Sequence, residues 1–267
     1  MTAQMIRRFH LMCQSYKPKI PSFIDQNVLV RQVSDFFNLP LADVRWHYER
    51  YRILHDLKRY SDILGERKTL CFEEAFIIYV ILACFRPPTI VEIGTQYGKS
   101  TRRIIDIKDL MKTNSRVICY DVVDEVKHFT PDEAQLILND VTHTFRQDVL
   151  GAYAPGMIYL DAHPYHLLKN VISEFLSYPG DCILAIHDCS RGLCNPNMTL
   201  SRDELNITSN TGVWERHVLA EIFGVKNPMS DQLDDIYTST HHLKVFGTPH
   251  GLAVIQPKRL LRQESYI

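Results

Sequence analysis

VEIGTQYGKST, residues 91–101, joins a predicted strand to a predicted helix and carries two glycines four positions apart. The β-branched run from Thr89 to Ile93 favours a short buried strand, and the pattern from Ser100 to Met111 favours a helix. Gly94 permits a tight turn and the close approach of a ligand to the backbone, and Gly98 does the same one turn later. We therefore expect a strand–turn–helix unit whose turn binds a ligand.

Three side chains near the glycines have predicted roles in this turn. Ser100 or Thr101 is expected to cap the helix by accepting hydrogen bonds from its free backbone N–H groups. The remaining N–H groups can meet a carboxylate of the ligand. Glu92 is expected to hydrogen-bond toward an ammonium group, through the backbone or water.

Two other nucleotide-binding turns do not fit the spacing. A dinucleotide motif needs a second glycine two positions after Gly94, where the chain has Gln96. A phosphate-binding P-loop needs a glycine five positions before Gly98, where the chain has Ile93. A generic α/β turn that happens to contain glycine stays open as the alternative.

Outward from this unit, short apolar runs alternate with helical patterns. This alternation predicts a Rossmann-like α/β fold, with a parallel sheet of about seven strands and helices on both faces. A terminal antiparallel hairpin is expected across residues 247–251, which include two glycines and a proline. The other expected strands are 116–120, 142–146, 157–160 and 182–186, with hairpin strands 242–246 and 252–255, and the other expected helices are 131–138, 167–176 and 213–223.

The N-terminal part of the chain shows a different pattern. Residues 1–40 are expected to be irregular, because three prolines interrupt them. Helices are expected from Leu41 to Leu64 and from Phe72 to Phe85. We therefore expect a helical extension, residues 1–70, that serves as a lid or as a dimer element. Residues 71–267 are expected to form the ligand-binding domain.

Composition sets broad limits on function. The 267 residues carry 30 basic and 31 acidic side chains, so net charge gives no direction toward nucleic acid or an acidic membrane. A mild basic excess in the first 60 residues is better explained by a solvated helix face. The longest apolar run, Ala75 to Phe85, is too short to cross a bilayer. Seven scattered cysteines, without any CxxC pair, predict reduced thiols in a cytoplasmic protein.

Acidic side chains fall at or just past the ends of five predicted strands. In parallel α/β sheets, ligands bind beyond the carboxyl ends of the strands. Asp121 can hold both hydroxyls of a ribose, and a strand-end turn former is the alternative. Asp148 is expected to accept from an adenine amino group. The five residues are Glu92, Asp121, Asp148, Asp161 and Asp188.

The region from Phe72 to Asp188 resembles the class I S-adenosylmethionine-dependent methyltransferases. Three segments carry the resemblance: EEAFIIYVILACFRPPTIVEIGTQYGKST, MIYLDAHPYHLLKNVISEF and ILAIHDCS. They are similar to a bacterial group of small-molecule O-methyltransferases and cephalosporin-hydroxylase-like proteins. The resemblance implies an enzyme that binds S-adenosyl-L-methionine. The residues implied to bind it are Glu92, Gly94, Thr95, Tyr97, Gly98, Ser100, Thr101, Asp121 and Asp148.

The resemblance also implies a metal site. A divalent metal lowers the pKa of an oxygen nucleophile that binds it, and the implied ligands here are Asp161 and Asp188. Such hard oxygen ligands suit Mg²⁺. The chain departs from the family pattern because His187 and Cys189 stand where relatives commonly have a further acidic or amide ligand. His187 could bind a softer metal such as Zn²⁺, Mn²⁺ or Fe²⁺, or act as an unmetallated base.

The predicted catalytic residues are Asp161, His163 and His187. A histidine just after the aspartate of the fourth strand is a recurrent candidate base in relatives, so His163 is the predicted general base. The polar stretch from Ser190 to Thr211 follows Asp188 directly and is predicted to be a substrate lid.

The leading hypothesis is O-methylation of a small hydroxylated molecule, such as a sugar or a secondary metabolite. Nucleic acid and membrane are not the expected partners, and a homodimer is considered for the N-terminal extension. Three alternatives stay open: an RNA-directed methyltransferase, a non-catalytic binding module on the same fold, and a metal-dependent oxygenase that uses the His/Asp cluster.

Overall fold

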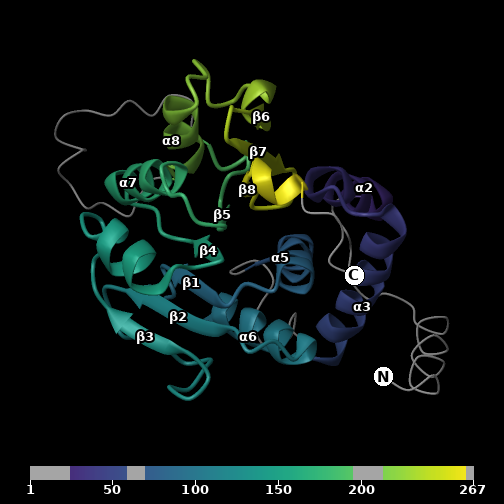
Figure 1. Cartoon of the computed structure of the whole chain (residues 1–267), viewed down its shortest axis with the longest axis vertical. Helices are drawn as coiled ribbons and strands as arrows, with labels where there is room; N and C mark the ends of the chain where they lie inside the picture. The colour runs from purple at the N-terminus through teal and green to yellow at the C-terminus, as the bar shows by residue number, and fades with distance from the viewer. Residues whose placement is uncertain (1–24, 59–69, 195–212, 263–267) are drawn as a thin grey trace. The chain divides into compact units, whose positions relative to one another are not determined.

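The computed structural model of the chain describes residues 25–58, 70–194 and 213–262 (Figure 1). The chain divides into two compact units, residues 1–80 and 81–267. The predicted boundary at residue 70 stays a prediction. The predicted lid, residues 190–211, falls mostly outside the described residues.

Helices make up the described part of the first unit. Helix α2, Gln26–Phe37, corrects the expectation that residues 1–40 are irregular. Its start is stabilised by Asp25, whose carboxylate accepts from the backbone N–H groups of Asn27 and Val28. The prolines that suggested irregular structure lie outside the helix. Helix α3, Leu41–Leu57, begins where predicted, and its expected continuation to Leu64 lies outside the described residues.

Helix α5, Phe72–Phe85, has the predicted bounds and crosses from the first unit into the second. The predicted bounds are confirmed because the apolar run of this helix ends just before two consecutive prolines, residues 87 and 88, which disfavour helical structure in the residue before them. In the part of the chain that the structure describes, no helix combines the length and apolar character needed to cross a membrane.

The second unit is built on one eight-stranded sheet with the order β3-β2-β1-β4-β5-β8-β7-β6. Strands β1 to β5 run parallel, and β8 joins β5 in the antiparallel sense. The predicted parallel sheet with a terminal hairpin is confirmed. The additional strand is β6, a three-residue edge strand that pairs with β7. The bounds are β1 Thr89–Ile93, β2 Arg116–Asp121, β3 Gln135–Leu138, β4 Met157–Leu160, β5 Ile183–Ile186, β6 Asp235–Tyr237, β7 His241–Phe246 and β8 Leu252–Pro257.

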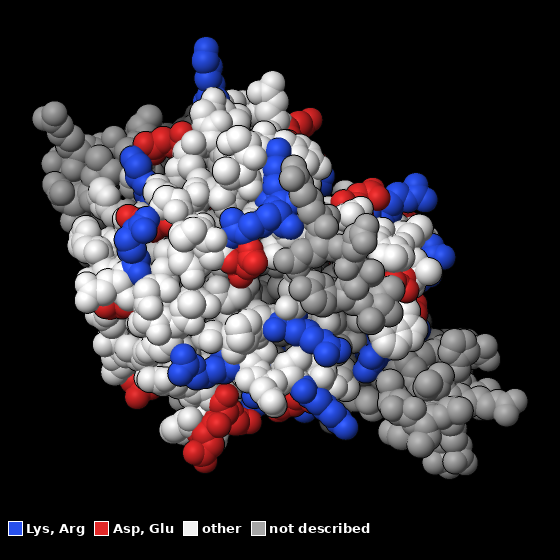
Figure 2. Space-filling model, viewed as in Figure 1, with Lys and Arg blue, Asp and Glu red and all other residues white. Residues whose placement is uncertain are grey.

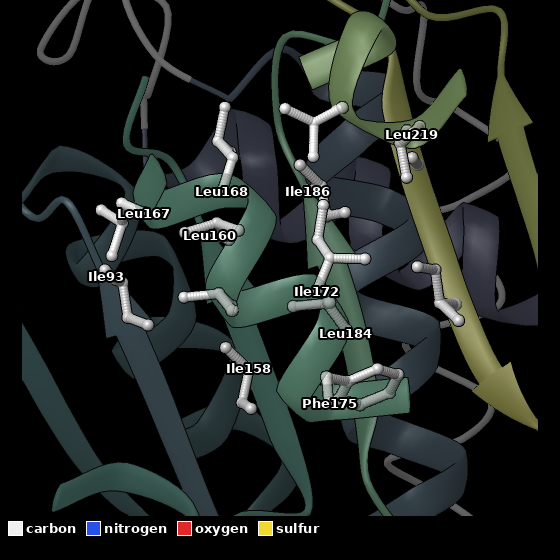
Figure 3. Close-up of a cluster of buried hydrophobic side chains, with 14 of the residues drawn as sticks. Ile93, Ile158, Leu160, Leu167, Leu168, Ile172, Phe175, Leu184, Ile186 and Leu219 are labelled. Carbon is white, nitrogen blue, oxygen red and sulfur yellow. The ribbon is translucent and has the colours of Figure 1, made fainter. Parts of the chain in front are cut away.

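Helices cover both faces of this sheet, as predicted. One face packs against α7, Tyr165–Leu176, and α8, Glu215–Ile222. Figure 3 shows the buried cluster that joins them, with alternate residues of β1, β4 and β5 facing Ile172 and Phe175 of α7. The opposite face meets α6, Lys99–Met111, because Ser100 of that helix hydrogen-bonds to Glu92 of β1. The alternation of β1 between the two faces follows from the two-residue period of a strand.

The third strand differs from the prediction. A helix was expected at residues 131–138 and a strand at residues 142–146, but β3 occupies Gln135–Leu138 and a π-helical turn occupies Arg146–Gly151. Strand β3 is the edge of the sheet and is partly exposed along its length. Its apolar run, Leu136 to Leu138, is too short for periodicity to distinguish a strand from a helix. Asp148 therefore lies on a helical turn and not directly past a strand.

The surface in Figure 2 carries basic and acidic side chains that are interspersed. Among the described residues on this face, Lys and Arg alternate with Asp and Glu and do not form a continuous basic stripe. The view is consistent with the nearly balanced charge of the sequence.

Candidate active site

The turn after β1 has the backbone geometry that its glycines predict. Gly94 and Gly98 adopt φ angles of +87° and +78°, and Gln96 between them adopts +46°. Residues other than glycine are disfavoured at such φ angles. A Cβ atom at Gly94 would also overlap the carbonyl oxygen of Asp161. Glycine at this position therefore lets the end of β1 lie directly against the end of β4.

Asp121 brings the end of β2 to the other side of the same turn. Its carboxylate accepts from the backbone N–H of Gln96 at 2.6 Å and from that of Val122 at 2.7 Å. The carboxylate is partly exposed and has further lone pairs available for a ligand. The carboxylate of Asp148 accepts a hydrogen bond, 3.1 Å long, from the side-chain amide of Asn139, the residue directly after β3.

Glu92, Ser100 and Thr101 form a buried cluster on the α6 side of the sheet. The two hydroxyl groups donate to the two carboxylate oxygens of Glu92, which is fully buried. The predicted capping of the helix by Ser100 or Thr101 is wrong, because α6 begins after Gly98 without a side-chain cap. Burial raises the pKa of Glu92 to about 7, although hydrogen bonds from Ser100 and Thr101 oppose the rise. Roles for these three side chains in ligand binding stay predictions.

The other two predicted loop residues have distinct surroundings. Thr95 is buried, and its carbonyl oxygen accepts from the N–H of Gly98 at 2.8 Å. The ring of Tyr97 lies 4.6 Å from the ammonium group of Lys127, and the backbone of Lys127 donates to its carbonyl oxygen. Tyr97 therefore packs under the segment that follows β2.

The ends of β4 and β5 bring three predicted site residues together. Asp161, His187 and Asp188 each offer one ligand atom, and these atoms lie within 4.8 Å of one another. His187 Nδ1 is 3.2 Å from Asp161 Oδ1 and 3.4 Å from Asp188 Oδ1. Burial opposes ionisation of Asp188, but the hydrogen bond from His187 and the nearby histidines lower its pKa. Two carboxylates and one imidazole at this spacing could hold a divalent cation. The predicted metal ligands stay a prediction.

His163 lies beside this cluster and contacts Glu215, a residue that the sequence did not suggest. His163 Nδ1 is 2.8 Å from Glu215 Oε1, and His163 Nε2 is 3.8 Å from Asp188 Oδ2. The hydrogen bond to Glu215 raises the pKa of His163 to about 9, against the effect of burial. At neutral pH, in the protein without ligands, both ring nitrogens of His163 are therefore protonated and the ring carries a positive charge. Its predicted role as general base stays a prediction.

Glu215 could not be found from the sequence because it is not near a strand end. It is the first residue of α8 and is buried, with 1% of its surface exposed. Burial raises the pKa of this carboxyl group to about 7, and the hydrogen bond with His163 acts in the opposite direction. Only the packing of α8 beside α7 brings it to the site.

The segment after β5 is held by the β7–β8 loop. The N–H of Cys189 donates to the carbonyl of Gly251 at 2.8 Å, and the N–H of Ser190 donates to that of His250 at 2.7 Å. A Cβ atom at Gly251 would overlap the backbone of Ser190. Asp188 itself adopts a φ of +58°, an uncommon conformation that this anchoring sustains. The loop therefore fixes the direction of the Asp188 side chain.

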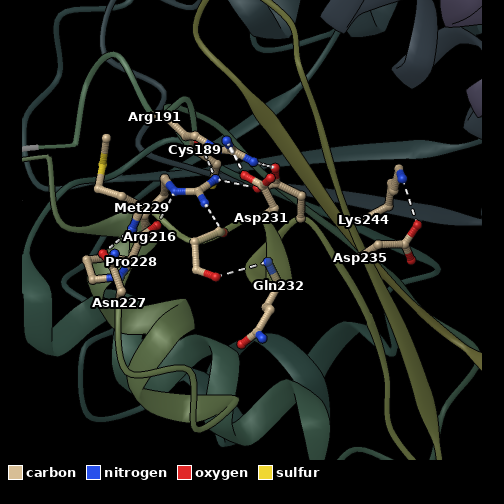
Figure 4. A network of polar contacts seen from close by, with 12 residues as sticks. Cys189, Arg191, Arg216, Asn227, Pro228, Met229, Asp231, Gln232, Asp235 and Lys244 are labelled. Atoms are coloured by element: carbon tan, nitrogen blue, oxygen red, sulfur yellow. Dashed lines mark hydrogen bonds and ion pairs between the residues drawn. The ribbon is translucent and has the colours of Figure 1, made fainter.

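Arg216 holds the same segment from the other side (Figure 4). Its guanidinium group is buried and donates to the carbonyl of Cys189 at 3.2 Å and to Asp234 at 2.9 Å. It also donates to the carbonyl of Pro228 at 2.6 Å. The neighbouring residues Glu215 and Arg216 thus contact the chain just after β4 and just after β5, respectively.

Comparisons with known proteins give structural neighbours only. No family model matches the chain, and no curated protein matches it. A methyltransferase of Podospora anserina, solved with SAH, is 13% identical, with a TM-score of 0.45 over 96% of this chain and 97% of that one. A putative caffeoyl-CoA O-methyltransferase from Staphylococcus aureus is 14% identical, with a TM-score of 0.49 over 76% of this chain and 91% of that one.

A third neighbour is the O-methyltransferase TomG of Streptomyces achromogenes, solved in complex with SAM. It is 13% identical, with a TM-score of 0.47 over 96% of this chain and 99% of that one. At these identities and scores the likeness decides neither the site nor the reaction. The function has to follow from the geometry of the site itself.

Proposed function

We propose that this chain transfers a methyl group from S-adenosyl-L-methionine to an oxygen of a small hydroxylated molecule. One observation carries the proposal: the glycine turn after β1 is flanked by Asp121 of β2 on one side and by Asp161, just after β4, on the other. Strand β1 stands at the point where the strand order reverses. In open α/β sheets, that position beyond the carboxyl ends is where nucleotide ligands bind.

The proposed donor site uses the groups that converge on this turn. The carboxylate of Asp121 would accept from the ribose hydroxyls, because it is partly exposed and is already fixed by the N–H of Gln96. The first N–H groups of α6 would meet the amino-acid carboxylate of the donor. Asp148 would accept from the adenine amino group, held in place by the amide of Asn139.

The proposed acceptor site uses the cluster after β4 and β5. The donor, bound at the glycine turn, would supply an electrophilic methyl group, and a divalent cation at the acceptor site would lower the pKa of the acceptor hydroxyl. Asp161, His187 and Asp188 would hold the cation, because their ligand atoms already lie within 4.8 Å of one another. The anchors at Gly251 and Arg216 keep Asp188 in its unusual backbone conformation, so the acceptor oxygen is oriented without a large rearrangement.

Calorimetric titration of the full chain with S-adenosyl-L-methionine tests the donor half of the proposal. We expect saturable binding that Asp121→Asn weakens by about 10-fold or more, the magnitude of losing a hydrogen bond to a charged group. Asp109→Asn is a matched control, because Asp109 is an exposed aspartate of α6 outside the turn. Absence of binding at millimolar donor, or equal affinity in Asp121→Asn, would overturn the donor site.

The acceptor half is tested by methyl transfer to a panel of sugars and phenols with isotopically labelled donor. We expect label in a hydroxylated acceptor and loss of transfer in Asp161→Asn. Label only in RNA, with strong salt dependence, would favour the RNA-directed alternative.

The oxygenase alternative receives support from His187 in the cluster and His163 beside it, since histidine and carboxylate ligands also hold catalytic iron. Oxygen consumption with Fe²⁺ and without the methyl donor would favour that alternative. Methyl transfer under anaerobic conditions would exclude it as the main activity.

A further inference from the structure

We propose that His163 is a direct ligand of the cation, that Glu215 positions its ring, and that the site therefore selects a cation that accepts imidazole, such as Zn²⁺, Co²⁺, Mn²⁺ or Fe²⁺, over Mg²⁺. The inference rests on the cation site of the proposed function. It does not depend on the methyl donor. It assigns a fourth ligand beyond Asp161, His187 and Asp188.

The spacing of the ligand atoms supports a single cation between these side chains. Bonds of about 2.0–2.1 Å to nitrogen and oxygen in a tetrahedral site place neighbouring ligand atoms about 3.3 Å apart. His187 Nδ1 lies 3.2 Å from Asp161 Oδ1 and 3.4 Å from Asp188 Oδ1. His163 Nε2 lies 3.8 Å from Asp188 Oδ2, the other oxygen of the same carboxylate. The ligand atoms of Asp161, His187 and Asp188 already lie within 4.8 Å of one another, and the His163 ring would have to turn toward them to complete the set.

The two nitrogens of His163 have separate partners. Nδ1 is 2.8 Å from Glu215 Oε1, so the hydrogen bond to that carboxylate fixes which nitrogen carries the proton. Nε2 then faces Asp188, and a bound cation would take the place of the proton on that nitrogen. Histidines that bind a metal almost always donate their other N–H to a carboxylate, a carbonyl or water, which orients the ring. Glu215, His163 and a cation would form such a triad.

Glu215 is a buried carboxylate, and apolar packing alone does not offset the free-energy cost of burying its charge. Its side chain is 1% exposed, and its second oxygen, Oε2, has no hydrogen-bond partner among the described residues. A buried carboxylate is costly unless it is paired. Its pairing partner here is His163, and a cation bound to His163 adds positive charge on the far side of the ring. Glu215 is therefore a positioning residue and does not itself bind the cation.

The donor set decides which cation fits. Mg²⁺ prefers oxygen ligands and retained waters, whereas imidazole suits Zn²⁺, Co²⁺ and Fe²⁺. Two imidazoles and two carboxylates thus favour a borderline transition metal over Mg²⁺. The centroid of the His250 ring lies 5.1 Å from that of His187. This assignment replaces the predicted role of His163 as general base, because one nitrogen cannot both bind the cation and take the substrate proton.

The test is titration of the metal-free full chain with Co²⁺, followed by visible absorption and calorimetry, with Mg²⁺ titrated in parallel. We expect one Co²⁺ per chain and weaker Mg²⁺ binding. Glu215→Gln should lower Co²⁺ affinity by about 10–100-fold, the usual cost of losing an orienting partner. His163→Ala should lower it further and change the Co²⁺ spectrum. Glu221→Gln is the matched control, because Glu221 lies on the same helix and pairs with Lys169 outside the cluster.

His163 is about one-third exposed, so His163→Ala should fold, and circular dichroism checks this. Wild-type Co²⁺ affinity and an unchanged spectrum in folded His163→Ala would overturn the inference, as would tighter binding of Mg²⁺ than of Co²⁺. Restoration of the wild-type spectrum by free imidazole in that variant would support it. If the chain does not bind the methyl donor but shows the expected cation binding, the proposed function is refuted and the inference about His163 stands.

Discussion

Glu92 gives the sharpest stability prediction, because its carboxyl group is fully buried and accepts two hydroxyl hydrogen bonds. Its pKa rises from 4.5 to about 7 on folding, mainly because burial penalises the charged form. At about 1.4 kcal/mol per pH unit, this difference corresponds to about 3 kcal/mol of pH-dependent stability. We test it with Glu92→Gln, which keeps the shape of the side chain and removes the titration.

The direction of the effect follows from where the proton binds. Below pH 4.5 the carboxyl group is protonated in both states and costs nothing. Between pH 4.5 and about 7 the folded protein holds the proton and the unfolded chain does not, so stability falls as the pH rises. Glu92→Gln should therefore be close to wild type at pH 5 and more stable by up to about 3 kcal/mol at pH 8.

The assay is urea unfolding of both proteins at pH 5, 6, 7 and 8, with the difference in unfolding free energy plotted against pH. Glu133→Gln serves as the control, because a hydrogen bond from Arg102 lowers the pKa of Glu133, the opposite direction from Glu92. Its difference from wild type should stay flat. A flat difference for Glu92→Gln as well, or one that reverses sign, would refute the reasoning.

Three further substitutions test how the site is supported. Gly251→Ala should destabilise the protein by about 2 kcal/mol or more and weaken cation binding, because position 251 has a φ of +81° and no room for a Cβ atom; urea unfolding and Co²⁺ titration measure both effects, and a neutral result would contradict the anchoring. Arg216→Met should cost about 3 kcal/mol in a thermal melt, since it removes the buried donor that Asp234 Oδ1 and the carbonyl of Cys189 share. Phe175→Ala should cost about 3–5 kcal/mol through a cavity beneath α7, and retention of wild-type stability would mean that the cluster in Figure 3 repacks.

Most of the sheet could be predicted because its central strands are buried on both faces. The strands β1, β4 and β5 read as continuous apolar runs, and their predicted bounds agree with the structure to within one residue. The edge strand β3 was missed, because its apolar run covers only three residues, Leu136 to Leu138, and fits a helix as well as a strand. The helix α2 was missed for a related reason, since nearby prolines outweighed its apolar spacing in the prediction.

Some residues of the candidate site could also be proposed from the sequence, and others could not. Residues at the ends of buried strands, such as Asp121, Asp161 and Asp188, could be proposed from the sequence because strand ends share one edge of a parallel sheet. Ser100 and Thr101 were assigned to a helix cap, but their hydroxyls face inward to Glu92. The sequence pattern gives the position of a side chain along the helix and not the partner that it meets across the interface.

The sequence by itself determined the central strands β1, β4 and β5, the glycine turn after β1 and the carboxylates that follow the strands, because local periodicity and turn chemistry act over a few residues. Tertiary structure alone decided that Glu215 reaches His163 and that Gly251 and Arg216 fix the residues after Asp188. Those contacts join positions 27 to 62 residues apart. They depend on how whole elements pack, which no short stretch of sequence encodes.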